Sequence, residues 1–274
     1  MRKEVVLTPP AETWRAAGDA DYPAFVRLFR ELGVADPTPT REAFAAMRAT
    51  MLVGEKRGQV VAYGYYILYG ATAHIVHVAV APEARGHGLG RALMDRLKTR
   101  VQAGGAVRWF LNVKQDNASA IRLYQRCGLK VALDSWAMRF AWSGVAALPA
   151  DERQLPATTP IPADDEAFAR LTQQPKERIG AVRARGRVLA SVHDDGRPVA
   201  FASFDPGYPG VYPVAVARPG LERTLFEALR PHADPAHGDL LRVTVDADRA
   251  LADRLVAAGA VIEHPIHRMT GSLM

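Results

Sequence analysis

The sequence predicts an α/β (α+β) protein built from two similar domains. With 274 residues, the chain is long for one domain and comfortable for two. Segments with strand-like and helix-like hydrophobic patterns alternate along it, which is typical of sheets flanked by helices. The order of these segments begins again in the second half, as an internal repeat would. We expect domains over residues 1–142 and 167–274, and a linker over 143–166 that contains four prolines.

Two amphipathic helices open the first half. Over residues 19–32, apolar side chains recur at i, i+3, i+4 and i+7, the spacing of one helix face. These side chains are Phe25, Leu28, Phe29 and Leu32. A shorter helix over 40–51 has Thr40 at its N-cap. Residues 51–70 predict two strands joined by a turn at residues 55–58.

The middle of the first half contains a strand followed by a burst of glycines. Residues 73–82, AHIVHVAVAP, are nearly all apolar and predict a central strand that is buried on both faces. The glycine-rich segment, residues 85–91, leads into a helix over 90–105. We expect a strand over 107–114, a helix over 117–128 that Asn117 caps, and one or two strands over 129–142.

The second half repeats this order after the linker. We expect a helix over 164–175, a hairpin over 187–206, a strand over 210–220, a helix over 221–233, a strand over 240–248, a helix over 249–259 and closing strands over 260–271. Residues 78–81 recur as residues 214–217, at an offset of 136, whereas residues 111–128 lie over 242–259 at an offset of 131. The smaller offset means that the second half lacks residues between its strand over 210–220 and the elements that follow. There, Arg218-Pro219-Gly220-Leu221 replaces the glycine-rich segment of the first half.

The charge of the chain is concentrated in its first half. Residues 1–142 carry 20 Lys and Arg against 12 Asp and Glu, a net charge of +8, and residues 143–274 carry 15 against 17, a net charge of −2. A basic half favours an anionic ligand, either nucleic acid or a phosphate-bearing cofactor. The alternative is a generic arginine-rich surface. We expect no nucleic-acid partner, because no long basic run with interleaved aromatic side chains is present.

Cysteine content and hydropathy limit the cellular location and the partners that we expect for the protein. The single cysteine, Cys127, excludes an internal disulfide and a multi-cysteine zinc site, and we expect no metal. No apolar run approaches the roughly 20 residues that span a bilayer, so we expect no membrane partner. The first 18 residues lack the apolar core and cleavage site of a signal peptide. We therefore expect a cytoplasmic location.

The glycine-rich segment has the chemistry of an anion site. The first N–H groups of a helix lack intrahelical partners, and the helix dipole places about half a positive charge there. Gly86, Gly88 and Gly90 let the backbone curl around an anion, and Arg85 and Arg91 add charge. The segment matches neither the P-loop nor the Rossmann spacing of glycines. We expect it to bind a phosphate or pyrophosphate, with a flexible turn as the alternative.

Two motifs carry a resemblance to a known family. The pattern V-x-V-x-P-x-x-R-G-x-G-x-G over residues 78–90 resembles the acetyl-CoA motif of the GNAT superfamily of N-acetyltransferases. The second signature, N-x-x-A-x-x-L-Y-x-x-x-G-F, matches Asn117, Ala120, Leu123, Tyr124 and Gly128, with Leu129 in place of Phe. The resemblance covers residues 12–142, and it covers the second half only in the order of elements.

The resemblance implies a fold and a binding site for acetyl-CoA. Each GNAT-like domain has a mixed, twisted central sheet flanked by helices, and in the first the parallel strands 73–82 and 107–114 splay apart to form the CoA cleft. Backbone groups of two valines would hold the pantetheine arm, and the glycine-rich segment would hold the pyrophosphate. The implied cofactor-binding residues are Val78, Val80, Arg85, Gly86, His87, Gly88, Leu89, Gly90, Arg91 and Asn117. For Asn117, helix capping alone is the alternative.

The resemblance also implies direct attack of a neutral amine on the thioester, which needs a base and an acid. Tyr124 is where the family keeps the acid that protonates the CoA thiolate, with a packed helix aromatic as the alternative. The oxyanion would lie near the N–H of Val78. His74 stands where family members often have a carboxylate base, and a period of two places it on the face of Val78. A structural histidine, a water chain or Glu55 are the alternatives.

The second half lacks these groups, and this shapes the expected function. Leu255 replaces Tyr124 and Asp248 replaces Asn117, which indicates a degenerate domain without cofactor. Such a domain would pack against the first, wall the amine site or form a homodimer. We expect an acetyl-CoA-dependent N-acetyltransferase that acts on a primary amine of a small molecule or peptide. The alternatives are a non-catalytic acyl-CoA sensor and an acetyltransferase acting on a protein or RNA. We expect Cys127 to be buried and inert, because its helix lacks a neighbouring His or Lys within a turn.

Overall fold

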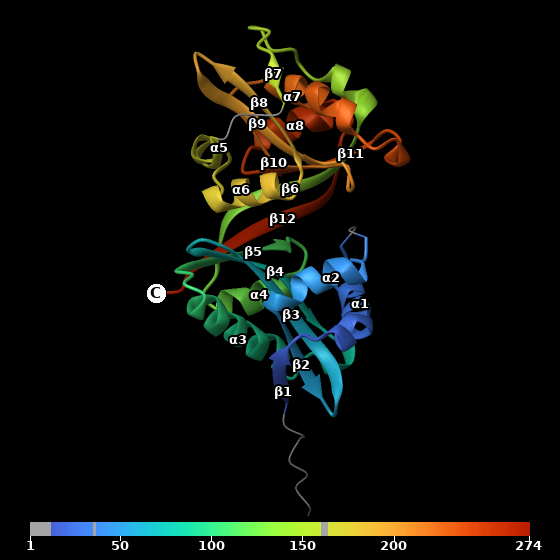
Figure 1. Cartoon of the computed structure of the whole chain (residues 1–274), viewed down its shortest axis with the longest axis vertical. Helices are drawn as coiled ribbons and strands as arrows, with labels where there is room; N and C mark the ends of the chain where they lie inside the picture. The colour runs from blue at the N-terminus through green and yellow to red at the C-terminus, as the bar shows by residue number, and fades with distance from the viewer. Residues whose placement is uncertain (1–11, 35–36, 160–163) are drawn as a thin grey trace, which may run out of the picture. The chain divides into compact units, whose positions relative to one another are not determined.

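The computed structural model describes residues 12–34, 37–159 and 164–274, and Figure 1 shows its two compact units. Unit 1 contains Met1–Leu111, Ser119–Lys130 and Thr270–Met274. Unit 2 contains Asn112–Ala118 and Val131–Met269. Most of the segment in which we expected no signal peptide, residues 1–11, lies outside the described residues, as do residues 160–163 of the expected linker.

Unit 1 has a mixed sheet of strands in the order β1-β2-β3-β4-β5. The strands are β1 (Thr13–Ala16), β2 (Met51–Lys56), β3 (Gln59–Tyr69), β4 (Thr72–Val80) and β5 (Arg108–Lys114). The pairings are antiparallel up to β4, and β4 and β5 are parallel. The helices are α1 (Tyr22–Arg30), α2 (Arg41–Met47), α3 (Leu89–Ala103) and α4 (Ala118–Arg126). This mixture of pairings confirms the sheet type that the resemblance implied.

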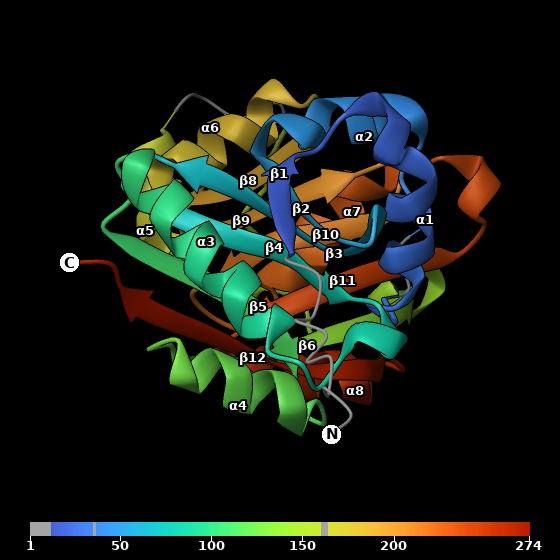
Figure 2. The same cartoon turned by 90° about the horizontal axis from the view of Figure 1, so that it is seen from below.

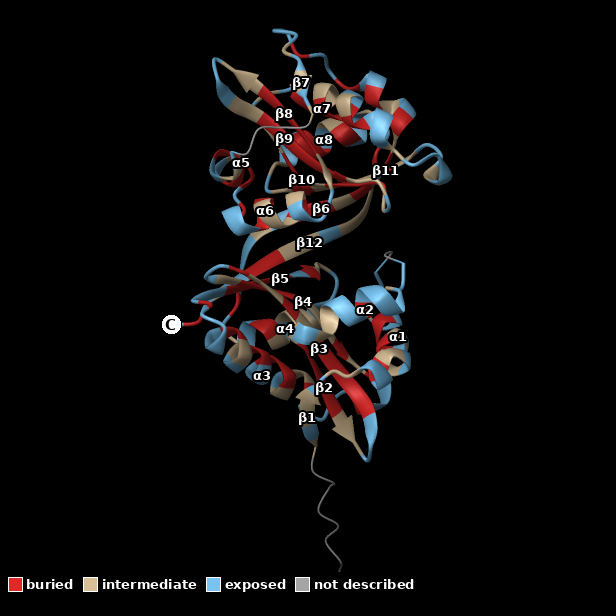
Figure 3. Ribbon diagram, viewed as in Figure 1, coloured by how far each residue is buried: buried red, intermediate tan, exposed pale blue. Residues whose placement is uncertain are grey.

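Helices cover both faces of the unit 1 sheet, as Figures 1 and 2 show for α3 on one side and α1 and α2 on the other. On the α1 face, Phe25 and Phe44 pack on Tyr63 in one apolar cluster. On the α3 face, a Cβ at Gly64 would come within 2.6 Å of Leu97, so the glycine allows α3 to approach β3 closely. Figure 3 shows the buried residues concentrated on the strands and on the inner sides of the helices.

Local sequence signals set the element boundaries in unit 1. Thr40 accepts a hydrogen bond from the Ala43 N–H at 3.3 Å, so the expected N-cap of α2 is confirmed. The helix expected over 19–32 begins as a 3-10 turn at Asp19–Asp21 and continues as α1. The turn between β2 and β3 is formed by Arg57 and Gly58, both with positive φ, as a tight hairpin requires.

A β-bulge in β4 changes which way its histidines face. Tyr65 pairs with His77 whereas the next residue, Tyr66, pairs with Ile75, so β4 has one extra residue there. Below the bulge His74 pairs with Ile67, and above it His77 pairs with Tyr65. Paired residues share a face, so His74 and His77 both lie on the α1 face. The expectation that His74 shares the face of Val78 is wrong, because the bulge reverses the alternation.

Unit 2 has a sheet in which the first part of β12 is followed by strands in the order β6-β11-β10-β9-β8-β7. The strands are β6 (Lys130–Ala141), β7 (Ala157–Thr158), β8 (Val188–Asp194), β9 (Arg197–Asp205), β10 (Gly210–Val216), β11 (Leu240–Asp246) and β12 (Val261–Ser272). The helices are α5 (Asp165–Thr172), α6 (Lys176–Ala184), α7 (Leu221–Leu229) and α8 (Arg249–Ala257). Phe168 and Ile179 of α5 and α6 pack on Phe201, and α7 and α8 belong to the main core on the other face.

The two units divide the chain differently from the predicted boundary at residue 142. Strand β6 pairs antiparallel with β11 along its length and so belongs to unit 2. In return the last residues, Thr270–Met274, belong to unit 1, where the Leu273 N–H donates to the Val107 carbonyl at 2.9 Å. The expected linker is partly core, because Trp142, Val145 and Leu148 are buried in the main cluster of unit 2.

The internal repeat is visible in the irregularities of the two sheets. Strand β10 has a bulge between Val211 and Val214, at positions equivalent to the bulge in β4. Both bulged strands pair with the next parallel strand over a short stretch only: β4 with β5 up to Ile75, and β10 with β11 up to Val211. Beyond these points the strands splay apart, as the resemblance implied for the first domain.

Candidate functional site

The glycine-rich segment forms an open loop at the start of α3. Gly86 has a φ of 82° and Gly88 a φ of 83°, conformations that residues with a Cβ rarely adopt. A Cβ built at either glycine would meet no atom within 4 Å, so the loop surrounds open space. Gly88 is the N-cap of α3 and offers no side-chain cap, so the first N–H groups of the helix have no capping side chain. This arrangement can bind an anion through its backbone.

The arginines at either end of the loop are held by local contacts. Arg85 donates to the Val80 carbonyl at 3.0 Å and pairs with Glu31 at 2.9 Å. Arg91 pairs with Asp95 and donates to the Arg126 carbonyl at 2.7 Å, which ties the start of α3 to the end of α4. Exposed ion pairs of this kind contribute little to stability. Either guanidinium can therefore exchange its carboxylate for a phosphate at little cost.

The backbone of β4 presents hydrogen-bonding groups to the gap beside β5. The Ala81 N–H donates to the Val61 carbonyl at 2.8 Å, so residues 81 and 79 direct their backbone groups to β3. In an antiparallel ladder the alternate residues, Val78 and Val80, then direct theirs away from β3. Beyond Ile75, β4 does not pair with β5. The N–H of Val78 and the N–H of Val80 therefore face the splayed gap.

Tyr124 lies on α4, close to the loop. A Cβ on Gly90 would lie 3.1 Å from Leu123, the neighbour of Tyr124, so α3 and α4 are in close contact there. The Tyr124 side chain is 8% exposed, and burial raises its pKa well above the usual range. Its phenol is therefore protonated at neutral pH. Within residues 12–34, 37–159 and 164–274, no group accepts a hydrogen bond from this hydroxyl, so the proton is available to a ligand.

The other predicted residues are placed as follows. His87 turns Nδ1 toward the Arg85 carbonyl at 2.8 Å, and Leu89 is buried at the first position of α3. Asn117 stands directly before α4, at the cap position, and its N–H donates to the Lys114 carbonyl at 3.1 Å. Asn117 belongs to unit 2 and the loop to unit 1.

The candidate bases differ in their surroundings. His74 is buried, and its ring stacks on Phe110 with centroids 4.3 Å apart. His77, which the sequence analysis did not select, is half-buried beside Phe29, and its Nδ1 lies 3.3 Å from the Tyr63 hydroxyl. Glu55 is paired with Arg15 at 2.5 Å and so has a structural partner.

Cys127 lies at the end of α4 and is half-buried rather than buried as expected. Burial raises the pKa of its thiol, against a smaller opposing effect of Arg91. The thiol is therefore mainly protonated at neutral pH, which supports the prediction of an inert side chain.

The corresponding place in unit 2 is filled by the protein itself. Gly220 is the N-cap of α7, and its N–H donates to the buried carboxylate of Glu222 at 3.0 Å. Arg254 pairs with the same carboxylate at 2.5 Å. A Cβ on Gly220 would lie 2.4 Å from the backbone of Asp151, so the chain covers this helix start. Glu222 is a second residue that was not predicted from the sequence, although a carboxylate in the first helical turn is a recognisable signal.

The described residues show neither a metal cluster nor a membrane-spanning helix. Over the described ranges, no group of three or more His, Cys, Asp and Glu side chains could hold a metal ion. The same part of the chain contains no helix long and apolar enough to cross a membrane.

Comparison with known proteins agrees with this geometry. The profile of the Acetyltransferase (GNAT) family matches residues 15–129. Mycothiol acetyltransferase of Thermobifida fusca (strain YX) is 33% identical over 124 residues, which are 43% of this chain and 36% of that protein. The chain thus spans about a third of the length of this relative.

Two solved structures match nearly the whole chain. A GCN5-related N-acetyltransferase from Sphaerobacter thermophilus superposes with a TM-score of 0.70 at 20% identity and covers 97% of both chains. A tandem GNAT protein from the clavulanic acid biosynthesis pathway gives a TM-score of 0.65 at 17% identity and covers 96% of this chain and 99% of that one. These matches show the fold, and they confirm the predicted class of two GNAT-like domains in tandem.

Proposed function

We propose that the protein is an acetyl-CoA-dependent N-acetyltransferase acting on a primary amine, and the match of residues 15–129 to the acetyltransferase (GNAT) family supports this. The acceptor is a small molecule or a peptide. The observation that carries the proposal is the pairing of an open anion loop at the start of α3 with a protonated tyrosine, Tyr124, on the helix packed against it.

The proposed cosubstrate site follows the geometry of unit 1. Residues 85–91 hold the pyrophosphate of acetyl-CoA through the N–H groups of the α3 start, and Arg85 and Arg91 complement its charge. Val78 and Val80 bind the amides of the pantetheine arm through their backbone groups, as an added strand would. Asn117, at the cap position of α4, is the proposed further contact to the same arm. No metal takes part in this proposal.

The proposed reaction is direct transfer. The neutral amine attacks the thioester carbonyl carbon, and the Val78 N–H stabilises the resulting oxyanion. The carbon–sulfur bond then breaks, and Tyr124 donates its proton to the leaving thiolate. A base takes the proton that the amine loses. We propose a water chain, with His74 as the alternative, because His74 lies on the face of the sheet opposite the Val78 side chain. Glu55 fits this role less well, because Arg15 occupies its carboxylate.

We propose that unit 2 does not repeat the chemistry of unit 1. In α7 the start of the helix is occupied by Glu222 and covered by Asp151, which supports the proposal that unit 2 binds no CoA pyrophosphate. The counterpart of Tyr124 is Leu255, which is fully buried and cannot donate a proton. Its proposed roles are to wall the amine site or to form a homodimer.

Thiol release from acetyl-CoA tests the proposal. Wild type and Tyr124→Phe are compared over a panel of polyamines, amino acids, aminoglycosides and peptides. We expect amine-dependent release that falls at least tenfold in the variant, because general acid catalysis contributes about 10²–10⁴ in rate. Tyr69→Phe is the matched control, since this tyrosine of unit 1 is similarly buried, at 6% exposure. CoA binding without amine-dependent release would support the acyl-CoA sensor, or a protein or RNA substrate absent from the panel.

A further inference from the structure

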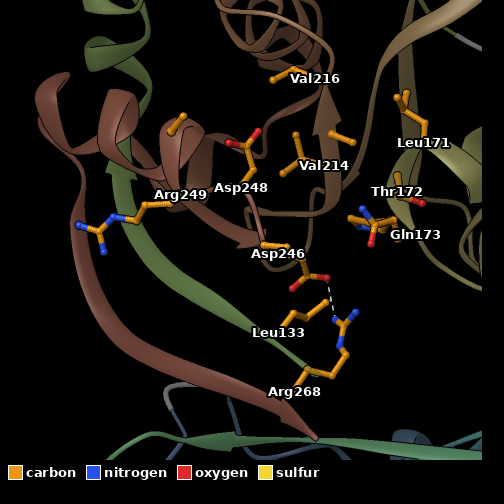
Figure 4. Close-up of a pocket in the computed structure, with 14 residues that line it drawn as sticks. Leu133, Leu171, Thr172, Gln173, Val214, Val216, Asp246, Asp248, Arg249 and Arg268 are labelled. Carbon is orange, nitrogen blue, oxygen red and sulfur yellow. Dashed lines mark hydrogen bonds and ion pairs between the residues drawn. The ribbon is translucent and has the colours of Figure 1, made fainter. Parts of the chain in front are cut away.

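Unit 2 contains a pocket that the proposed reaction does not use. It encloses about 490 Å³ where β10 and β11 splay apart, a volume within the range of about 300–1,000 Å³ for small-molecule sites. Figure 4 shows Val214 and Val216 of β10 on one side and Leu171 of α5 on the other. The start of α8 also contributes to the wall.

The strand edge inside this pocket can bind amides. The Ala217 N–H donates to the Val199 carbonyl at 2.8 Å, so residues 217 and 215 direct their backbone groups to β9. The alternate residues, Val214 and Val216, direct theirs into the pocket. Their side chains are apolar. An extended chain with secondary amides would therefore pair with β10 as an added strand.

The pocket differs from the proposed CoA site of unit 1, because its lining among the described residues includes none from the start of α7. That helix start is occupied by Glu222 and covered by the Asp151 backbone, so it offers no open loop for a pyrophosphate. A second carboxylate at this place, Asp151, pairs with Arg218 at 2.9 Å. A ligand of this pocket therefore carries no phosphate.

The charges that line the pocket leave one carboxylate to a ligand. Both lining arginines are neutralised: Arg268 pairs with Asp246 at 2.6 Å, and Arg249 pairs with Asp253 at 2.9 Å. Figure 4 shows the Arg249 side chain directed away from the pocket. Asp248 caps α8 by accepting from the Leu251 N–H at 2.9 Å through Oδ1. Among the described residues, Oδ2 of this carboxylate has no partner, and Figure 4 shows Asp248 beside Val214.

We propose that this pocket binds a short peptide in an extended conformation, with its free amino terminus at Asp248. The ammonium group meets Oδ2 of Asp248, and the following amides pair with Val214 and Val216. Small aliphatic side chains of the peptide pack against the apolar wall that includes Leu133 and Leu171. The site is separate from the acetyl-CoA loop and does not depend on turnover there.

Calorimetric titration of the full chain tests this proposal. The probe is the tripeptide Ala-Val-Ala amide with a free amino terminus. Ala250→Trp fills the pocket at an exposed position of α8, and Ala257→Trp is the matched control on an exposed position of the same helix outside the pocket. We expect the pocket variant to weaken binding by at least about tenfold, and the control to bind as wild type does. Equal binding by all three proteins would overturn the proposal.

A double-mutant-type cycle, which combines Asp248→Asn with N-acetylation of the peptide, tests the contact with Asp248 independently of the tryptophan variant. Asp248→Asn keeps the N-cap, because Asn caps helices about as well as Asp. We expect this change to weaken the free peptide about tenfold, the range of a charge-assisted hydrogen bond. N-acetylation of the peptide should cause the same loss in wild type and no further loss in the variant. An acetylated peptide that binds wild type as tightly as the free one would refute the ammonium contact.

Titrations with pantetheine and CoA test whether the pocket binds a CoA-like ligand instead of a peptide. Pantetheine has the amides without the amine, and CoA adds the phosphates. The site that Ala250→Trp removes should prefer the free peptide to both, whereas preference for either of them would overturn the proposal. Tyr124→Phe should keep the site, so failure of the proposed acetyl transfer and failure of this inference are told apart.

Discussion

Replacing two glycines of the loop by alanine tests how unit 1 binds its cosubstrate. Gly86 and Gly88 have φ values of 82° and 83°. An alanine held in the left-handed region costs roughly 1–2 kcal/mol, so the double variant costs about 2–4 kcal/mol when the loop keeps this shape. No atom lies within 4 Å of either added Cβ, so packing adds nothing. Without CoA, the exposed loop of the variant can relax to another conformation. The conformational cost of the two alanines therefore lowers the affinity for CoA.

The expected effect is a loss of CoA affinity of about thirtyfold to several-hundredfold. Isothermal titration measures it for CoA and for pantetheine, which lacks the pyrophosphate and should bind both proteins equally. Gly105→Ala is the matched control, because Gly105 has a φ of 87° and the same open surroundings at the other end of α3. It should lower the free energy of unfolding by about 1 kcal/mol and leave CoA affinity unchanged. Unchanged CoA affinity in the double variant would refute the anion loop.

Three further predictions concern single side chains. Cys127→Ser should change the rate of thiol release by less than about twofold, because the raised pKa of the thiol keeps it protonated; a large loss in steady-state assays would indicate an acyl-cysteine. His74→Asn should lower kcat/KM by about 10²-fold or more if His74 is the base, because general base catalysis contributes about 10²–10⁴ in rate, and an unchanged kcat/KM would exclude this role. The hydrogen bond from Arg15 lowers the pKa of Asp21 below its ordinary value of 3.8. The ionised Asp21 therefore stabilises the fold above pH 3.8, and this stabilisation is lost as the pH falls through the lowered pKa. Urea unfolding of Asp21→Asn should therefore show a deficit at neutral pH that shrinks below pH 4 in comparison with wild type; a constant deficit would contradict this origin.

The glycine-rich loop and the hairpin turns could be predicted from the sequence because single residues determine their conformation. Positive φ favours glycine at Gly86 and Gly88, and the turns between β2 and β3 and between β8 and β9 carry glycine at their second position, Gly58 and Gly196. The N-cap at Thr40 likewise depends on one side chain and its neighbours. Such local requirements leave a mark in the sequence.

The face of the sheet on which His74 lies could not be predicted, because it depends on how β4 pairs with β3. A period of two holds only while a strand continues without a bulge, and the extra residue in β4 reverses the alternation. No residue type marks the bulge, which becomes visible in the register between Tyr65 and His77. The sequence therefore placed His74 on the wrong side of the sheet.

The exchange of closing strands was missed for a similar reason. Strand β6 and the last residues of β12 have the hydrophobic pattern of strands, but the pattern does not name the neighbour. Helix α6 was missed because Gly180 interrupts its pattern. In the structure, a Cβ at Gly180 would lie 3.3 Å from Asp165, so the glycine serves the close approach of α5 and α6.

Detection of the acetylated amine by mass spectrometry tests the central claim most directly. Wild type is incubated with acetyl-CoA and the amine panel, with Tyr124→Phe alongside. We predict an amine heavier by one acetyl group, formed in step with free CoA and at least tenfold more slowly by the variant. Tight binding of acetyl-CoA with no acetylated product from any amine, peptide or protein would contradict it, and unit 1 would then be a sensor of acyl-CoA.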